Sequence, residues 1–150
     1  MKIIPKTLAR SLAVVALAAP AILMGSAQAS AAVRIFPADG GTCVGTQVMR
    51  CLELRYDDAS ERFRARAEIT DVAGGSDATV DITRVIAAGQ LTGESPEPNP
   101  TWERLESPFT TCTQGRQVSV GFSADFRWKN NATGAVGSET RYGYAVFTCS

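Results

Sequence analysis

Three arginines alternate along one segment of the chain and are its clearest candidates for chemistry. Arg62, Arg64 and Arg66 share one face of a predicted strand, where successive side chains stand about 7 Å apart. Guanidinium groups bind carboxylates and sulfates bidentately, so the row is a possible binding surface for an acidic or sulfated partner. The competing interpretation is a solvated sheet face whose arginines pair with acids such as Glu53 and Glu68.

Other catalytic groups are scarce. The 150 residues include no histidine, which excludes Ser-His-Asp and Cys-His nucleophile machinery and histidine metal ligands. Lys129 is the one lysine beyond residue 30, and the dense acids Asp57-Asp58 and Glu94/Glu97 show turn-like or loop-like spacing. Adjacent turn acids point apart, whereas glycoside hydrolysis needs two carboxyls facing each other. We therefore expect no enzyme, no cofactor and no metal; a small carboxylate-dependent hydrolase is the weakest alternative.

The four cysteines predict two disulfides. An even number of cysteines in an exported chain is typical of a disulfide framework. Of three possible connectivities we favour Cys43–Cys51 and Cys112–Cys149, because each joins the ends of a plausible local unit. A four-thiolate zinc site lacks a C-x-x-C pair and would need reduced thiols outside the cell.

Several aromatic residues could form a platform on which sugars stack, although such residues more often pack in a core or on a sheet face. They are Tyr56, Trp102, Trp128, Tyr142 and Tyr144.

A loop from residue 88 to residue 100 carries three prolines, two acids and no periodic pattern. Such a loop could insert into the cleft of a protease, so a secreted protease or enzyme inhibitor is the second functional hypothesis. No cysteine lies within ten residues of its centre, which weakens that hypothesis. A tolerated surface insertion is the simpler interpretation.

The first 31 residues predict a signal peptide. Lys2, Lys6 and Arg10 precede an apolar run over residues 11–24, which is shorter than a membrane span, and an A-x-A site occupies residues 27–29. The first 30 residues hold three bases and no acid, which leaves 12 bases and 15 acids in the remainder. A net charge of −3 argues against a nucleic-acid partner, and cleavage would leave no membrane attachment.

Alternation of apolar and polar residues predicts strands throughout residues 32–150, which we expect to form a single domain. The segments 47–56 and 61–71 alternate, with Arg50 interrupting the apolar face of the first, and flank a turn at residues 57–60, which indicates a hairpin. In the segment 78–87, Val80, Ile82 and Ile86 are expected to face the core, with Arg84 interrupting that face.

Further strands are expected at residues 33–36, 117–128 and 138–149, and a short edge strand near Cys112 should bring Trp102, Leu105 and Phe109 into the core. One-sided strands must bury their apolar faces against a second sheet. The sequence therefore predicts an all-β, antiparallel β-sandwich of six to seven strands with immunoglobulin-like architecture; a small β-barrel is the alternative.

Taken together, the residues favour a small, secreted, non-enzymatic domain in the extracellular space or cell envelope. It is expected to be a monomer that binds an unknown protein or a cell-wall or polysaccharide partner. The strong preference for arginine over lysine, at 12 to 3, and the many alanines and glycines indicate a bacterial source.

Overall fold

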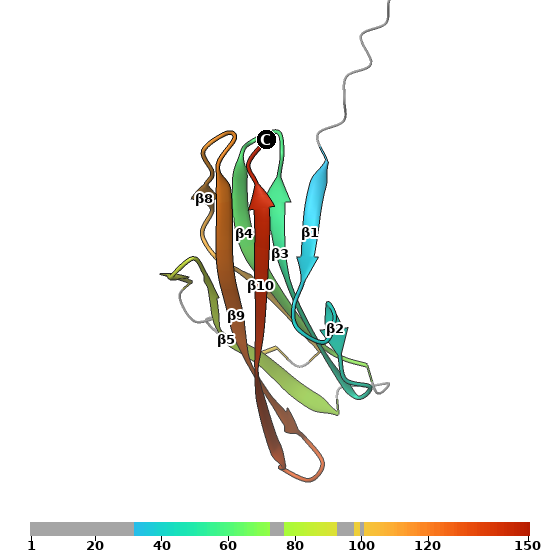
Figure 1. Cartoon of the computed structure of the whole chain (residues 1–150). Helices are drawn as coiled ribbons and strands as arrows, with labels where there is room; N and C mark the ends of the chain where they lie inside the picture. Colours follow the sequence, from blue (N-terminus) through green and yellow to red (C-terminus); the bar gives the residue numbers. More distant parts are fainter. Residues whose placement is uncertain (1–31, 73–76, 93–97, 100) are drawn as a thin grey trace, which may run out of the picture.

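The computed structural model describes residues 32–72, 77–92, 98–99 and 101–150. The predicted signal peptide and the centre of the predicted 88–100 loop lie outside these ranges. Two antiparallel sheets pack face to face, with β9 and β10 in front of β3 and β4 in Figure 1. The first sheet has the order β1-β3-β4-β7, with β2 beside β3 and β8 beside β4; the second has the order β10-β9-β5-β6.

The strands of the first sheet are β1 (Val33–Pro37), β2 (Cys43–Val44), β3 (Val48–Asp57), β4 (Arg62–Asp71), β7 (Trp102–Glu106) and β8 (Thr110–Thr111). Those of the second are β5 (Ala78–Ala87), β6 (Gln90–Leu91), β9 (Gln117–Asn130) and β10 (Val136–Thr148). The predicted sandwich is confirmed. The strand count exceeds the expected six or seven because three of the ten strands are only two residues long.

The β3–β4 hairpin forms where alternation predicted it. Asp57 closes the turn by accepting hydrogen bonds from the Ala59 backbone N–H and the Ser60 hydroxyl, at 3.0 and 2.8 Å. Every second residue of the two strands faces the other sheet and is buried: Leu52, Leu54, Tyr56, Phe63, Ala65, Ala67 and Ile69. This inner layer supplies much of the hydrophobic stabilisation of the fold.

Aromatic rings fill one end of the core. The ring of Phe147, from β10, lies 5.0 Å from those of Phe36 and Tyr56 and 5.7 Å from that of Phe63. Three strands of the first sheet therefore contact one side chain of the second, which fixes how the two sheets stack at this end.

A β-bulge changes which side chains of β5 face the core. The pairing register between β5 and β9 shifts between Ile82 and Arg84, so one extra residue separates them. Beyond the bulge Val85 and Ala87 are fully buried, whereas Ile86 is only half-buried. The prediction that Ile86 faces the core was wrong. Arg84 does not interrupt the core, because the bulge turns it outward.

β7 also faces the core with different residues from those predicted. Trp102 and Phe109 remain 41% and 49% exposed, so only Leu105 of the predicted three packs against the core. The residues that are buried instead are Glu103 and Ser107.

Both buried polar groups of this segment accept hydrogen bonds from backbone groups. The Glu103 carboxylate accepts the N–H of Ile82 at 2.8 Å, where the bulge disturbs the ladder. Ser107 Oγ accepts the N–H of Ala65 at 2.9 Å. Burying these side chains is thus compensated by donors that would otherwise lose their partners.

Both predicted disulfides are present. Cys43–Cys51 joins β2 to β3 at directly paired positions. Cys112–Cys149 ties the segment after β8 to the end of β10 across 37 residues of sequence. No free cysteine remains in the part of the chain that the structure describes.

Arg34 joins the two ends of the domain. Its guanidinium lies 2.8 Å from a carboxylate oxygen of Asp58 and donates to the Thr148 carbonyl oxygen at 2.8 Å. The Ser150 N–H donates to the Tyr56 hydroxyl at 2.8 Å. The start of β1 and the C-terminus accordingly lie at the same end of the sandwich (Figure 1).

Arg141 is buried between β10 and the β1–β2 connection, with only 4% of its surface exposed. Its guanidinium donates to the carbonyl oxygens of Asp39, Gly41, Thr42 and Arg50 at 2.6–3.1 Å. Burial lowers the pKa of Arg141 and the Glu139 carboxylate opposes that effect, but a guanidinium keeps its charge in proteins. The connection therefore folds around a permanent cation.

Among the described residues, no helix has the length and apolar character needed to cross a membrane.

Candidate functional site

The arginine row lies on the outer face of the first sheet, where acids surround it. Arg64 contacts Glu106 at 2.5 Å and Arg66 contacts Glu68 at 3.1 Å. Arg62 is exposed and forms no ion pair within the described ranges. An acidic ligand would have to displace the carboxylate partners of two of the three arginines, so the row is a weaker candidate than its spacing indicated.

Glu68 is the centre of this charged face. Its carboxylate accepts hydrogen bonds from Arg66 at 3.1 Å and from Arg104 at 3.0 Å, and Arg104 also lies over the Trp102 ring. Partial burial acts to raise the pKa of Glu68, but hydrogen bonds from Trp102, Arg104 and Arg66 outweigh it and hold the pKa below its usual value. The folded state thus favours the ionised carboxylate.

We expect Glu68→Gln to lower the free energy of unfolding by about 1 kcal/mol at pH 7, since a partly exposed carboxylate loses its charge-assisted hydrogen bonds. A carboxylate with a lowered folded pKa stabilises the fold above its unfolded pKa and loses that contribution as the pH falls through the folded pKa. The difference between the proteins should therefore shrink as the pH is lowered, as measured by urea unfolding at pH 7 and at an acidic pH below the usual glutamate pKa. Glu61→Gln, at a glutamate without an ion pair in the described structure, is the matched control. An equal loss at both pH values would contradict the assignment.

The aromatic residues of the predicted sugar platform are dispersed. Tyr56 is fully buried, Trp128 lies beneath the Arg50 guanidinium and Trp102 beneath that of Arg104. Tyr142 and Tyr144, by contrast, are 61% and 63% exposed. The structure brings only these last two together.

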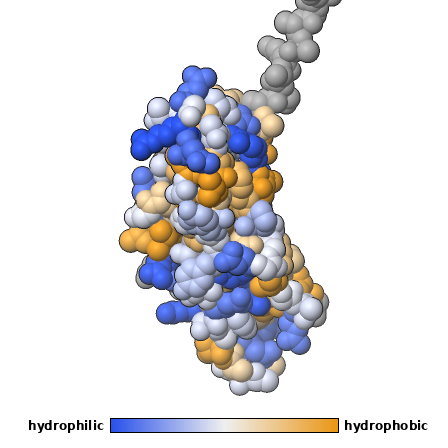
Figure 2. Space-filling view, viewed as in Figure 1, coloured by the Kyte–Doolittle hydropathy of each residue, from blue (hydrophilic) through white to orange (hydrophobic). Residues whose placement is uncertain are grey.

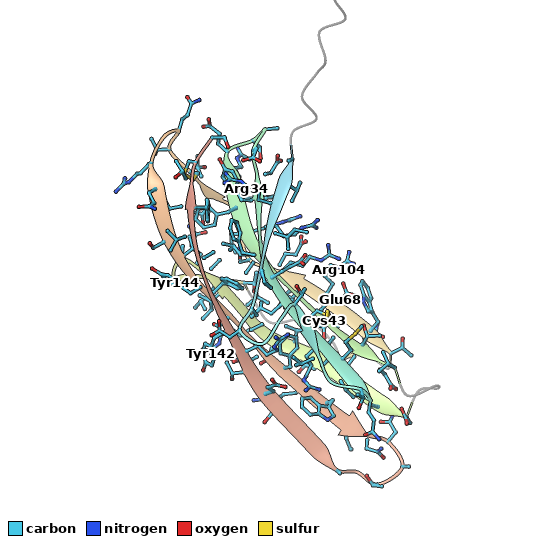
Figure 3. All side chains as sticks on the ribbon, turned by 45° about the vertical axis from the view of Figure 1, so that its right-hand side comes forward. Arg34, Cys43, Glu68, Arg104, Tyr142 and Tyr144 are labelled. Carbon is cyan, nitrogen blue, oxygen red and sulfur yellow. A yellow bond between two sulfur atoms is a disulfide. The ribbon has the colours of Figure 1, made fainter. Side chains whose placement is uncertain are left out.

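Tyr142, Tyr144 and Val146 alternate along β10 and point away from the sandwich; we call them the tyrosine face. Figure 3 shows the two tyrosines projecting from the side opposite Arg104 and Glu68. Val146 is 48% exposed. Figure 2 looks onto this side, where pale and orange side chains occupy the upper middle, between hydrophilic groups above and below.

The outward positions of β9 that lie directly beside the tyrosine face carry only small side chains. Ser123, Gly121 and Ser119 of β9 lie directly across from Tyr142, Tyr144 and Val146, respectively. We call these three residues the low strip. Neither it nor the tyrosine face contains a charged residue.

Charges on this sheet begin further along the same outer face. Arg84 contacts Asp125 at 2.6 Å, and the Thr140 hydroxyl donates to Asp125 at 2.8 Å. The Asp125 carboxylate and the Arg84 guanidinium compensate each other, and the exposed Arg127 and Lys129 follow on the same face of β9, so this end of the sheet is polar and charged.

A cleft of about 480 Å³ opens at the end of the sandwich opposite the C-terminus. The residues that line it include Arg50, Trp128, Asp71 and Asp77. Arg50 is already engaged there, because Glu139 accepts its Nε hydrogen bond at 2.6 Å and its guanidinium lies 4.7 Å from the Trp128 ring centre. The cleft therefore offers a ligand little unused hydrogen-bonding capacity from its arginine.

Asp71 and Asp77 converge in this cleft, which sequence spacing did not predict. A hydrogen bond with Asp71 raises the pKa of Asp77, so the two carboxyls share a proton over part of the acidic range. Glycosidases place a substrate between carboxyls about 5–10 Å apart. A directly hydrogen-bonded pair leaves no such space. Within the described residues, no group of three or more acids or cysteines could hold a metal ion.

Only the two ends of the predicted exposed loop are described. Its first residues form a tight hairpin in which β6 pairs with the end of β5, and Asn99 forms an isolated bridge with Val80. Residues 93–97 and 100 lie outside the described part, so the inhibitor hypothesis stays a prediction.

No family model, curated protein or solved structure matches this chain. Its function must be inferred from its own surface.

The sequence pattern placed Tyr142, Tyr144 and Val146 on one face of a strand but did not indicate which face is buried. It did not identify Gly121 or Arg141. Gly121 continues the period-two series of Ser119 and Ser123, and that series was the available signal.

Proposed function

We propose that this protein is an exported, non-enzymatic binding module of bacterial origin that recognises an extracellular or cell-envelope partner through the tyrosine face. The observation that carries the proposal is the exposure of Tyr142 and Tyr144 to more than three-fifths on a rigid strand, while Tyr56 and Phe147 are buried. An immunoglobulin-like architecture and secretion after signal cleavage are further parts of it.

The position of the tyrosines supports recognition. A tyrosine offers a large amphipathic contact area and loses little conformational entropy when it binds, because it has only two side-chain torsions. Tyr142 and Tyr144 belong to a 13-residue strand paired along its length with β9. Holding them on a paired strand lowers the entropic cost of binding further.

The disulfides support the proposed location. Two disulfides in a domain of about 120 residues are compatible with an oxidising environment, such as the outside of a bacterial cell. The absence of histidine argues for binding rather than catalysis.

We expect the oxidised protein, immobilised and exposed to cell-envelope and culture-supernatant fractions, to retain a specific component. Tyr142→Thr/Tyr144→Thr should reduce that retention at least ten-fold, because two exposed aromatic contacts are lost while β-propensity is kept. Quantitative mass spectrometry of the eluted material measures the effect.

The control removes two exposed aromatics from the other sheet, with Trp102→Thr/Phe109→Thr, and should retain the component as the parent protein does. Equal retention by the tyrosine variant, or no specific retention by the parent protein, would refute the proposal.

A further inference from the structure

Gly121 occupies a position where nothing in the described part of the chain requires glycine. It lies in the middle of β9 and points outward, and its backbone is not in the left-handed region. A Cβ built there would meet no atom within 4 Å. Because glycine weakens a strand interior, its presence here lacks a conformational or packing reason.

Other strand glycines in the second sheet do have packing reasons. At Gly137 a Cβ would lie 2.2 Å from the Trp128 ring, and at Gly143 it would lie 2.2 Å from the Phe122 ring. Tyr144 lies opposite Gly121 but does not fill the space above it, since that space is open. Gly121 is therefore not covered by a neighbouring aromatic ring, as edge glycines in sheets often are.

A strand glycine that no bulge, bend or neighbouring side chain explains is typical of a place where a ligand approaches the backbone closely. Here the open backbone lies between the hydroxyls of Ser119 and Ser123 and beside the phenol rings of Tyr142 and Tyr144. A ligand lying on the low strip would contact hydroxyl groups beneath it and aromatic rings along one side.

The chemistry of this surface selects the ligand class. It has no charge, its hydroxyls both donate and accept hydrogen bonds, and its aromatic rings attract the weakly positive C–H groups of an apolar ring face. A pyranose ring combines hydroxyls at its rim with C–H groups on its faces. Acidic polymers find no cation within the low strip or the tyrosine face, and Arg84, further along the sheet, is paired with Asp125.

A second copy of this chain fits less well. From their exposed fractions, the three side chains of the tyrosine face expose on the order of 400 Å². A stable protein–protein interface needs about 800 Å² on each partner. Self-association through these residues alone would thus be weak.

We infer that the low strip and the tyrosine face together bind a neutral polysaccharide, with one sugar unit lying over Gly121 and stacking against Tyr144. This inference rests on the proposed function and names the partner's chemistry. In this arrangement the missing side chain of Gly121 lets the sugar ring contact the backbone of β9.

The test compares Gly121→Thr with the parent protein. Threonine should raise the Tm by about 3 °C, because it improves strand propensity at an open position. It should also reduce binding at least ten-fold, because its side chain fills the space above the strip. Affinity electrophoresis in gels containing neutral β-glucan, xylan, mannan or α-glucan measures binding, with polygalacturonate as the anionic comparison. Arg127→Thr, on the same strand and the same face but outside the strip, is the matched control.

Retention of the parent protein and of Arg127→Thr by at least one neutral polysaccharide, with loss in Gly121→Thr, is the expected result. Binding only to polygalacturonate, or equal binding by Gly121→Thr, would overturn the inference. If no polysaccharide retards the protein while the tyrosine-dependent capture of a protein succeeds, the inference fails and the proposed function stands. A dimer in sedimentation analysis that Gly121→Thr abolishes would likewise replace the polysaccharide by a second copy.

Discussion

Replacing Arg141 by methionine is expected to lower the free energy of unfolding by about 3 kcal/mol, the largest effect we anticipate for a single side chain. Methionine can fill much of the buried volume but cannot donate to the four carbonyl oxygens that the guanidinium now binds. Hydrogen bonds to charged groups contribute about 1.5–3 kcal/mol each, and the lost cost of burying a cation offsets part of the total.

Urea unfolding of the oxidised protein at neutral pH measures this loss. Arg127→Met is the control, because Arg127 is exposed on the adjacent strand, and it should change stability by less than about 0.5 kcal/mol. Arg141→Lys should lower the free energy of unfolding by an amount between those of Arg141→Met and Arg127→Met. An ammonium keeps the charge but cannot reach four acceptors in one plane.

Equal stability of Arg141→Met and the parent protein would show that the β1–β2 connection finds other donors. One carbonyl has such a donor already, because Thr42 also accepts the Leu52 N–H at 2.8 Å. The expected loss therefore depends mainly on the acceptors that have no second donor.

The second large loss in the free energy of unfolding is expected from Cys112→Ala/Cys149→Ala. The chain-entropy model assigns about 4 kcal/mol to a crosslink that closes a 37-residue loop. Small domains are stable by only about 5–15 kcal/mol, so this is a large share of the total. Alanine avoids placing a hydroxyl at two positions that are no more than 3% exposed.

The matched comparison is Cys43→Ala/Cys51→Ala. Its eight-residue separation should contribute about 2.5 kcal/mol by the same model. Urea midpoints and slopes under non-reducing conditions separate the two contributions. A smaller loss for the Cys112–Cys149 pair than for the Cys43–Cys51 pair would contradict the loop-length explanation.

Period-two patterning predicted strands well where each strand has one continuous pairing register. β4 is such a case: its arginines and Glu68 face outward, and Phe63, Ala65, Ala67 and Ile69 face inward. A single alternation sufficed there, because a strand without a bulge keeps each side chain on its face.

The prediction failed for β5 because of a tertiary feature. The bulge between Ile82 and Arg84 reverses the alternation, and the N–H of Ile82 finds its partner in the Glu103 carboxylate, about twenty residues further along the chain. A local sequence pattern does not indicate such a long-range contact. The same contact explains why β7 buries Glu103 while Trp102 stays exposed.

The candidate site was predictable only in part. The alternation of Tyr142, Tyr144 and Val146 is visible in the sequence, but the opposite face, with Ala145 and Phe147, is equally apolar. The choice between them depends on Phe147 packing against Phe36 and Tyr56, which lie about a hundred residues earlier. The importance of Gly121 depends on the empty space above it, which no sequence pattern reports.

The attachment of residues 149–150 to the rest of the sandwich has a consequence for proteolysis. Proteases cleave segments that can leave the folded domain. Here Cys149 is crosslinked, the Ser150 N–H donates to Tyr56, and the Ser150 hydroxyl donates to Asp58. A protease could cleave at these residues only after this end of the sandwich opened locally, so they should resist digestion in a protease-rich medium.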